Sequence, residues 1–421
     1  MAKIGIYGGT FNPPHLGHVL AARAAKASLG LDQVLLIPDG QPPHKELPEG
    51  SPTPEQRLEM TRLAAETEPW LKACGIEFGR PGKSYTSDTL RELKRQYPDD
   101  TLYLLMGTDM FLSLHTWHEP QVICQHSVIV GFRRQEGPEG EMEAQKKNLE
   151  ASFGARVELV DNQPLEISST QLRRMLVLGG AAHYSIPSVL EYIRAHGLYG
   201  TGRDYRNLPM EELRDVATSL LKPRRVQHVL GCAKTAKALA ERYGADPVLA
   251  ERAGLLHDIT KAMDGPDQLL LLDEYDIIVS DFERNHPKLL HAKTGAGVAQ
   301  HLFGECDQVV SAIYWHTTGK PDMALMEKIV YIADYMEPTR NFPGVEELRK
   351  AVFADLDRGL LRGFEMCIAE LIRENKTVCR DSVDARDYLR RQLGGPEAEI
   401  WKDESVADIK RDCNCGSQGL G

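Results

Sequence analysis

The chain has 421 residues, of which 42% are hydrophobic and 26% charged, and its formal net charge is −11. This length allows two or three domains with their own cores, and the composition is that of an ordinary globular protein. The negative balance disfavours a protein that coats nucleic acid, so anionic ligands would be held by local features such as helix N-termini, single basic side chains or metal ions.

The sequence also limits where the protein is expected to work. No apolar run is long enough to cross a bilayer, and the chain opens without the charged and then apolar leader of a secreted protein. Its eight cysteines show no paired Cys-x-x-Cys spacing, which argues against a disulfide framework and a zinc ribbon. We therefore expect a cytoplasmic protein without membrane or nucleic-acid partners, and the sequence leaves a homo-oligomer open.

The first predicted strand, at 3–7, leads directly into the sequence GGTFNPPHLGH. Its two glycines lack a Cβ and let the backbone approach a ligand closely. A helix beginning near His15 would place His15 and His18 on one face of its N-terminal turn, where free N–H groups attract phosphate. The stretch therefore predicts a nucleotide phosphate site. The loop residues expected to line it are Gly8, Gly9, Thr10 and Phe11.

Further strands and helices alternate along the first half of the chain. The predicted strands are 33–38, 75–78, 101–106 and 127–131, and the predicted helices are 16–29, 53–66, 87–97, 110–114 and 141–153. Such alternation predicts an α/β domain, a parallel sheet with helices on both faces. Ligands bind such sheets beyond the carboxyl ends of the strands, where the turns at Gly9 and Gly107 would both lie.

Two other loops carry side chains that suit a ligand. Lys45, in the sequence PPHK after the second strand, supplies a flexible positive charge for phosphate, although a solvated lysine is the plainer interpretation. The turn at 82–90 gathers hydroxyl groups and a carboxylate, with Ser87 or Asp88 expected to cap the helix that follows.

The sequence ISSTQLRR at 167–174 places hydroxyl groups at a predicted helix N-terminus, with Arg173 one turn further along. An ordinary N-cap would explain the same residues. Together with GGTFNPPHLGH, however, this stretch resembles the two signatures of the HxGH nucleotidyltransferases, and in full the bacterial nicotinate mononucleotide adenylyltransferases. The resemblance covers about residues 2–200.

The resemblance implies a Rossmann-like domain at 1–200 in which ATP and nicotinate mononucleotide react to give deamido-NAD and pyrophosphate. His15 and His18 would be the catalytic groups at the ATP phosphates, with Mg²⁺ on the triphosphate. The other substrate-binding residues would be Ser168, Ser169, Thr170 and Arg173 at phosphates, Thr86, Asp88, Gly107, Asp109 and Trp117 at the nicotinate end, Lys45 near the mononucleotide and Arg134 near the adenosine. A different acceptor, such as phosphopantetheine or nicotinamide mononucleotide, stays open.

A glycine-rich polar linker is predicted at 201–208, and beyond it the strand pattern stops. Helical periodicity appears at 223–243, 248–256, 289–302, 308–315, 325–336, 357–372 and 382–393, which predicts an all-α domain at 209–395. Residues 396–421 lack periodicity and are expected to form a flexible tail with a Cys-x-Cys pair, a weak metal signal.

The helical half spaces histidines and aspartates along apolar stretches: His228, His257, Asp258, His291, His316 and Asp334. Asp334 follows the apolar sequence IVYIA, where burying a bare carboxylate would be costly. A metal cation removes that cost, and neutral imidazoles are good ligands for it. Because the set has nitrogen and oxygen ligands and no cysteine, it predicts a site for one or two divalent metals.

The order His…His-Asp…Asp resembles the HD phosphohydrolase superfamily, and the phrases LLHDITK, YWHTTG and IADYMEP are similar to its bacterial symmetrical diadenosine tetraphosphate hydrolases. This second resemblance covers about residues 209–395. It implies hydrolysis of diadenosine tetraphosphate to two ADP at iron, with Mn²⁺ or Co²⁺ also compatible with these ligands.

The core ligands of that site would be His228, His257, Asp258 and Asp334. His291 and His316 would complete a second metal position or touch the substrate phosphates. Asp258 and Lys261 are the expected catalytic residues of this half, and Arg225, Thr317 and Arg340 are further substrate-binding candidates. Two alternatives remain: an HD domain for another nucleotide, and a regulatory module with a structural metal.

Overall fold

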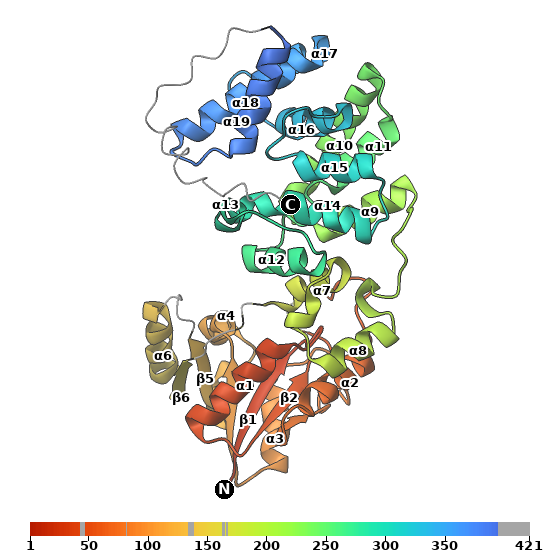
Figure 1. Ribbon diagram of the computed structural model, residues 1–421. Coiled ribbons are helices and arrows are strands. Elements are labelled where there is room, and N and C mark those ends of the chain that lie inside the picture. Colours follow the sequence, from red (N-terminus) through yellow and green to blue (C-terminus); the bar gives the residue numbers. More distant parts are fainter. Residues whose placement is uncertain (43–46, 81, 134–138, 162–164, 166, 395–421) are drawn as a thin grey trace, which may run out of the picture. The chain divides into compact units, whose positions relative to one another are not determined.

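The computed structural model describes residues 1–421 except 43–46, 81, 134–138, 162–164, 166 and 395–421. The chain divides into two compact units, residues 1–203 and 204–421, and each is described by itself (Figure 1). Lys45, Arg134 and the expected tail at 396–421 lie outside the described residues.

The first unit is built on a six-stranded sheet of order β3-β2-β1-β4-β5-β6, in which every neighbouring pair is parallel. The strands are β1 Lys3–Gly9, β2 Gln33–Pro38, β3 Leu71–Ala73, β4 Thr101–Met106, β5 Val128–Arg133 and β6 Arg156–Asp161. The predicted α/β class with a parallel sheet is confirmed. The strand order reverses between β1 and β4, so the loops after these two strands flank the crevice where such sheets bind ligands.

Helices cover both faces of this sheet. They are α1 Leu16–Leu29, α2 Pro54–Ala65, α3 Thr86–Gln96, α4 Thr108–Ser113, α5 Pro120–His126, α6 Glu139–Phe153, α7 Ser169–Leu178 and α8 Pro187–Ala195, with 3-10 turns at Leu114–Thr116, Ala181–His183 and Leu198–Gly200. A hydrophobic core lies on each face of the sheet, and alternate residues of β2 belong to one core or the other. Val34 and Leu36 pack with α1, α2 and α8, whereas Leu35 and Ile37 pack with α3 to α6.

Two local predictions in this unit are wrong. Residues 75–78 form a turn, and the third strand is Leu71–Ala73. The turn buries Glu77, whose carboxylate accepts a hydrogen bond from the Thr89 hydroxyl at 2.6 Å. Neither Ser87 nor Asp88 caps α3, because the helix begins at Thr86 with Tyr85 at the N-cap and both side chains lie inside its first turn.

The second unit is all-helical, as predicted. Its helices are α9 Met210–Leu220, α10 Pro223–Tyr243, α11 Pro247–Leu256, α12 Gly265–Glu274, α13 Asp281–Asn285, α14 Pro287–His301, α15 Asp307–Trp315, α16 Leu325–Met336, α17 Val345–Ala354, α18 Leu356–Arg373 and α19 Arg380–Gln392. The central helices α10, α11, α14, α15 and α16 pack against one another. The candidate metal ligands lie in these helices or directly after them, with His257 and His316 as the C-cap residues of α11 and α15.

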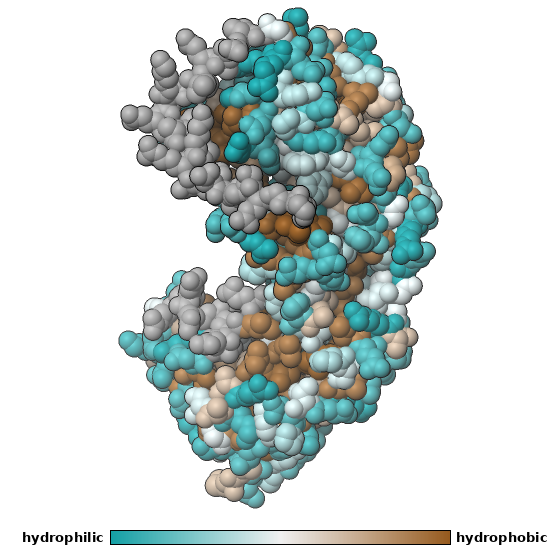
Figure 2. Space-filling view, in the orientation of Figure 1, coloured by the Kyte–Doolittle hydropathy of each residue, from teal (hydrophilic) through white to brown (hydrophobic). Residues whose placement is uncertain are grey.

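Hydrophilic residues are spread over both units on the face seen in Figure 2, in keeping with the charged composition. Among the described residues, no helix combines the length and the apolar character needed to cross a membrane.

Candidate active sites

The loop between β1 and α1 is held through its own carbonyl oxygens. Arg57, fully buried in α2, donates from Nη1 to the Thr10 carbonyl at 3.0 Å. Arg173 in α7 donates from Nη1 to the Asn12 carbonyl at 2.6 Å. Because the carbonyls are engaged by side chains of other elements, the loop conformation is fixed by long-range contacts as well as by its glycines.

Asn12 links this loop to two further segments. Its Oδ1 accepts a hydrogen bond from the Tyr199 hydroxyl at 2.7 Å, and its Nδ2 donates to the Ser51 hydroxyl at 3.0 Å. The Ser169 hydroxyl donates to the carbonyl of the next residue, Pro13, at 3.1 Å. The sequence analysis named Ser169 but missed Asn12 and Tyr199, although Asn12 belongs to the opening motif.

His15 and His18 lie together at the start of α1. His15 is the N-cap residue, and its backbone N–H donates to Nδ1 of His18 at 3.1 Å. The two rings are 3.8 Å apart, and a Cβ at Gly17 would lie 3.0 Å from the His15 ring, which explains the glycine between them. Burial lowers the pKa of His15 to about 2 and that of His18 to about 4.

The tautomer of His18 follows from its backbone contact. Because Nδ1 accepts a hydrogen bond, the proton of the neutral ring is on Nε2, which leaves that nitrogen as a donor. Such a donor beside the free N–H groups of a helix N-terminus suits the oxygen of a phosphate. The phosphate-binding residues predicted at the start of α7 also lie at this loop. They are Ser168, Ser169, Thr170 and Arg173. Ser168 is the N-cap of α7, and the Thr170 hydroxyl accepts a hydrogen bond from Arg173 at 3.1 Å.

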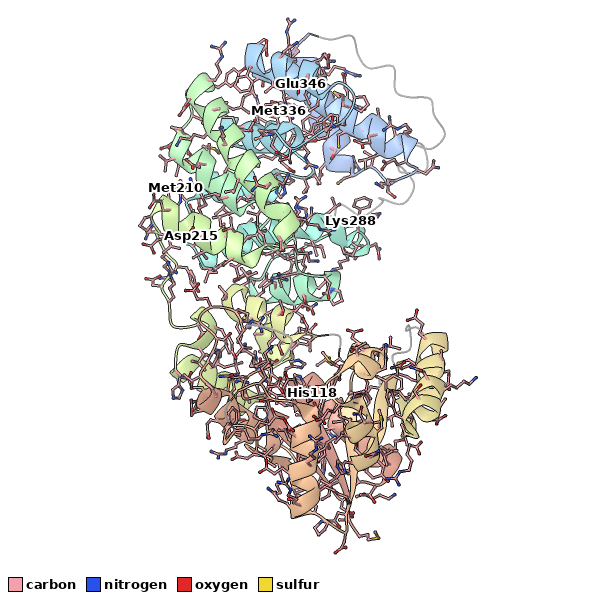
Figure 3. All side chains as sticks on the ribbon, turned by 180° about the vertical axis from the view of Figure 1, so that it is seen from behind. His118, Met210, Asp215, Lys288, Met336 and Glu346 are labelled. Atoms are coloured by element: carbon pink, nitrogen blue, oxygen red, sulfur yellow. The ribbon has the colours of Figure 1, made fainter. Side chains whose placement is uncertain are left out.

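The residues expected at the nicotinate end follow β4 or begin α3. Gly107 is the N-cap of α4, directly after β4, and Asp109 is exposed in the first turn of that helix. Trp117 is half-buried, with its indole N–H donating to the Ser113 hydroxyl at 3.3 Å. Thr86 is the first residue of α3, and Asp88 accepts a hydrogen bond from Arg91 at 2.9 Å. His118, labelled in Figure 3, stacks on Tyr85 at 4.2 Å beside them.

In the second unit, four histidines share one arrangement, in which Nδ1 faces a hydrogen-bond acceptor. Nδ1 of His257, His291 and His316 each faces the carbonyl oxygen of the residue three positions earlier, at 2.8, 2.6 and 2.7 Å. Nδ1 of His228 faces Oε1 of Glu337 at 3.0 Å. Since a carbonyl oxygen and a carboxylate only accept, each Nδ1 carries the proton and each Nε2 is left with a free lone pair.

These Nε2 atoms converge. The His228 and His257 nitrogens are 3.3 Å apart, and those of His291 and His316 are 3.1 Å apart. Burial lowers the pKa of His257 and His291 well below the usual range and that of His316 to about 3, so these three rings are neutral near pH 7. Ring nitrogens that face one another with lone pairs at such distances repel, so a cation between them would stabilise the cluster.

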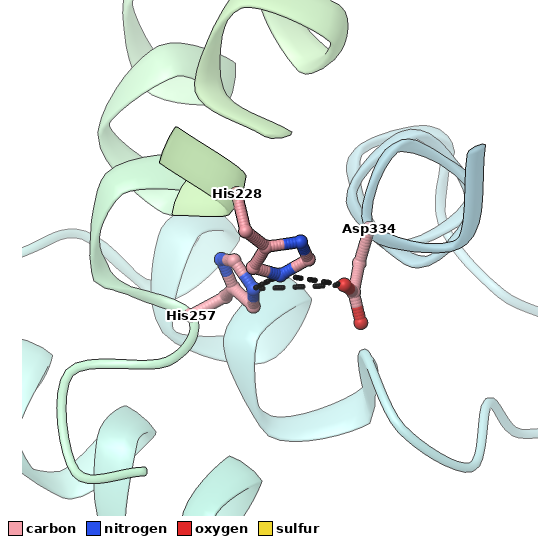
Figure 4. Close-up of side chains that lie close together, drawn as sticks. All are labelled: His228, His257 and Asp334. Carbon is pink, nitrogen blue, oxygen red and sulfur yellow. Dashed lines mark hydrogen bonds and ion pairs between the residues drawn. The ribbon is translucent and has the colours of Figure 1, made fainter. Parts of the chain in front are cut away.

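The two aspartates complete the cluster. Asp334 Oδ1 lies 3.1 Å from Nε2 of His228 and 3.8 Å from that of His257 (Figure 4). Asp258 lies between the histidine pairs: Oδ2 is 3.7 Å from both His228 and His257, and Oδ1 is 3.2 Å from His291.

The donor set fits a divalent cation. Ligand atoms of two groups, His228–His257–Asp334 and His257–Asp258–His316, lie within 4.8 Å of one another. Buried Oδ2 of Asp258 has no hydrogen-bond donor among the described residues other than the guanidinium of Arg225, with which it forms an ion pair. Neutral imidazoles and carboxylates are common ligands of first-row metals, and the residues that would hold such an ion are His228, His257, His316, Asp258 and Asp334.

Basic side chains surround this cluster. Lys261 Nζ is 2.9 Å from Nε2 of His291, and burial lowers its pKa to about 8. The Arg225 guanidinium forms an ion pair with Asp258, and Arg340 donates from Nη2 to Asp334 Oδ1 at 2.8 Å. Thr317 is half-buried next to His316 in the chain. Glu337 was missed by the sequence analysis, although it stands in the quoted phrase IADYMEP.

Comparison with known proteins agrees with this division. Residues 6–175 match the cytidylyltransferase-like family model, and residues 225–339 match the HD domain model. The fold and the two sites therefore define a nucleotidyltransferase-type domain followed by a helical HD domain.

Similar proteins narrow the first half further. A probable nicotinate-nucleotide adenylyltransferase of Oceanobacillus iheyensis is 38% identical over 205 residues, covering 48% of this chain and 100% of that protein. One of Shewanella sp. strain MR-4 is 40% identical, covering 47% of this chain and 99% of that protein. Through its first half, the chain belongs to the nicotinate-nucleotide adenylyltransferase family.

A solved structure resembles the chain as well. It is described as a predicted HD superfamily hydrolase involved in NAD metabolism, from Clostridium acetobutylicum. It is 36% identical, with a TM-score of 0.43, and covers 44% of this chain and 98% of its own.

Proposed function

We propose that the first unit transfers AMP from ATP to nicotinate mononucleotide, giving deamido-NAD and pyrophosphate. The observation that carries the proposal is the pair of neutral histidines at the N-terminus of α1, in a chain that belongs to the adenylyltransferase family. The phosphate of the mononucleotide attacks the α-phosphorus of ATP and pyrophosphate leaves, so no side chain has to act as a nucleophile.

Catalysis would then rest on positioning and on neutralising charge at the phosphoryl oxygens. His18 donates from Nε2 to a phosphate oxygen, and His15 fixes the orientation of His18 through its backbone N–H. Mg²⁺ enters with the triphosphate. In this proposal Gly8, Gly9, Thr10 and Phe11 line the ATP side, and Ser168, Ser169, Thr170 and Arg173 hold phosphate from α7. The nicotinate end is formed by Thr86, Asp88, Gly107, Asp109 and Trp117.

An acceptor screen tests this assignment. The full chain is given ATP and Mg²⁺ with nicotinate mononucleotide, nicotinamide mononucleotide or phosphopantetheine, and pyrophosphate release is measured. We expect the largest kcat/KM with nicotinate mononucleotide. A larger value with either of the other acceptors refutes the assignment.

We further propose that the second unit hydrolyses diadenosine tetraphosphate symmetrically, with water adding across the central anhydride bond to give two ADP. The observation that carries this proposal is the convergence of four Nε2 lone pairs on two aspartates. The metal, when bound, would supply Lewis acidity and an activated water. Iron is the proposed metal, with Mn²⁺ or Co²⁺ as substitutes.

The chain itself supplies binding and orientation. Lys261, Arg225 and Arg340 place positive charge around the cluster, where a polyphosphate needs neutralisation. Asp258 places negative charge 3.7 Å from Nε2 of His228 and 3.2 Å from Nε2 of His291, which would attract a cation to both histidine pairs.

Product analysis separates this proposal from its alternatives. The full chain is supplied with Fe²⁺ or Mn²⁺ and diadenosine tetraphosphate, and the products are resolved by ion-exchange chromatography. We expect ADP as the main product. If no ADP forms while a nucleoside monophosphate or another nucleotide is cleaved, the HD domain has another substrate; if nothing is cleaved, the metal is structural.

A further inference from the structure

One of the four histidines in the second unit is held differently from the others. His257, His291 and His316 donate to the carbonyl of the residue three positions earlier, so their own helices orient them. Within the described part of the chain, no acceptor from its own helix faces Nδ1 of His228, which instead donates to Glu337, 109 residues later in the chain. The orientation of His228 therefore depends on a side chain from another element.

Several contacts hold the Glu337 carboxylate beside His228. It is completely buried, and the Thr339 backbone N–H donates to its Oε2 at 2.7 Å while the Thr339 hydroxyl donates to Oε1. Gly231, one turn after His228 in α10, leaves room for the carboxylate, because a Cβ there would lie 2.5 Å from Oε2. A buried carboxylate is costly unless its oxygens are bonded, so these contacts stabilise it where it meets His228.

The same turn also orients Asp334. Arg340 donates from Nε to the Asp334 carbonyl at 3.0 Å and from Nη2 to its Oδ1 at 2.8 Å. The Glu337 carbonyl accepts a hydrogen bond from Arg349 at 2.7 Å, which fastens the turn to α17. Residues 337–340 thus contact two of the ligand candidates drawn in Figure 4.

We infer that Glu337 is a positioning residue of the metal centre. It keeps the proton of His228 on Nδ1, directs Nε2 toward Asp334 and makes that nitrogen a stronger ligand, as a carboxylate behind a metal-bound imidazole does. Glu337 touches neither substrate nor the reacting atoms. The inference rests on the proposed metal-dependent function of the second unit.

Metal titration tests it without an activity assay. Mn²⁺ binding to the full chain is measured by isothermal titration calorimetry, with the melting temperature of the metal-free protein as a check on folding. We expect Glu337→Gln, which keeps the side-chain volume, to weaken Mn²⁺ binding by about 10- to 100-fold. Thr339→Val, an exposed position that loses only the hydroxyl donor, should weaken binding by a smaller factor of about 2 to 5.

Glu347→Gln is the matched control. Glu347 is an exposed carboxylate in α17 and should leave Mn²⁺ affinity unchanged, because it takes no part in the contacts that hold Glu337. Equal affinity of wild type, Glu337→Gln and Thr339→Val overturns the positioning role while leaving the metal centre in place. If Glu337→Gln does not fold, the Thr339→Val affinity decides. If the wild type binds no Mn²⁺, Co²⁺ or Fe²⁺, the proposed metal centre falls and the inference with it.

Discussion

His18 in the first unit is half-buried and His257 in the second is fully buried, and both imidazoles have a pKa below the usual range. Their backbone contacts at Nδ1 are opposite. His18 accepts there from an N–H group, whereas His257 faces a carbonyl oxygen. Nε2 is consequently a donor in the first case and a lone pair in the second. The backbone group at one ring nitrogen thus separates an imidazole suited to phosphate from one suited to a metal.

The two sites also differ in the carboxylates that their histidines contact. His228, His257 and Asp334 form a compact group in the second unit, joined by Asp258. In the first unit, His18 instead packs against His15 and the aromatic rings of Tyr7 and Phe11. In the proposed function, Mg²⁺ enters the first site with ATP.

The largest effect should come from removing the aspartate that joins the two histidine pairs. Asp258→Ala should lower hydrolysis of diadenosine tetraphosphate by on the order of 10³-fold or more, since the cluster loses the carboxylate that lies between its two histidine pairs. Adenylyl transfer by the first unit should be unchanged. Initial rates of both reactions on the same preparation measure this, and circular dichroism monitors folding. If the variant unfolds the second unit, the metal is structural and the comparison of two catalytic sites fails.

The reverse experiment uses His18. His18→Ala should lower kcat for adenylyl transfer by about 10²- to 10³-fold, the usual effect of losing one donor to a developing phosphoryl charge. His18→Gln keeps an N–H donor of similar reach and should recover part of the rate. Hydrolysis should be unaffected. Equal rates for the alanine and glutamine variants would show that donation from position 18 does not contribute.

Acid should destabilise the second unit more steeply than the first. The unfolded histidines take up protons near pH 6.5, but the folded ones resist protonation because burial lowers the pKa of His15, His18, His257, His291 and His316. Below that pH the unfolded state binds more protons, so stability is present above pH 6.5 and falls as the pH falls. Each such histidine contributes a slope of about 1.4 kcal/mol per pH unit.

Two of these histidines are in the first unit and three in the second, so the slopes should differ. Hydrogen exchange of the metal-free protein, followed by mass spectrometry at pH 7.0 and 5.5 with correction for intrinsic rates, measures each unit separately. Equal loss of protection in the two units would contradict the expectation. Added Mn²⁺ should restore protection in the second unit alone.

The sequence predicted best the elements that are determined by residues close together in the chain. The bounds of α10 and α16 were predicted to the residue, because helical periodicity and the proline or polar residues at their ends are local signals. The turn at 75–78 was mistaken for a strand because alternation over four residues does not distinguish a strand from a turn that buries Glu77. Strand β6 and helices α5, α8, α9, α12, α13 and α17 were not predicted.

The candidate ligands of both sites were found because they stand in short, dense motifs. The residues that hold those motifs in place were not predicted, because their contacts join positions that are far apart in the sequence. Tyr199 reaches Asn12 over 187 positions, and Glu337 reaches His228 over 109. A single tyrosine or glutamate carries no signal of its distant partner in one sequence, and only the folded chain brings the two together.

The smallest effect we predict comes from one of these distant contacts. Tyr199→Phe removes the hydroxyl that donates to Asn12 Oδ1 and should cost about 1 kcal/mol, the usual value of one hydrogen bond between neutral groups. Because Asn12 belongs to the loop that precedes His15, kcat/KM for adenylyl transfer should fall about five-fold, with hydrolysis unchanged. Asn12→Ala alone and with Tyr199→Phe gives a double-mutant cycle. Strict additivity of the two changes would show that Tyr199 does not act through Asn12. Coupling between them would show that Tyr199 holds, through Asn12, the loop that precedes the phosphate-binding histidines.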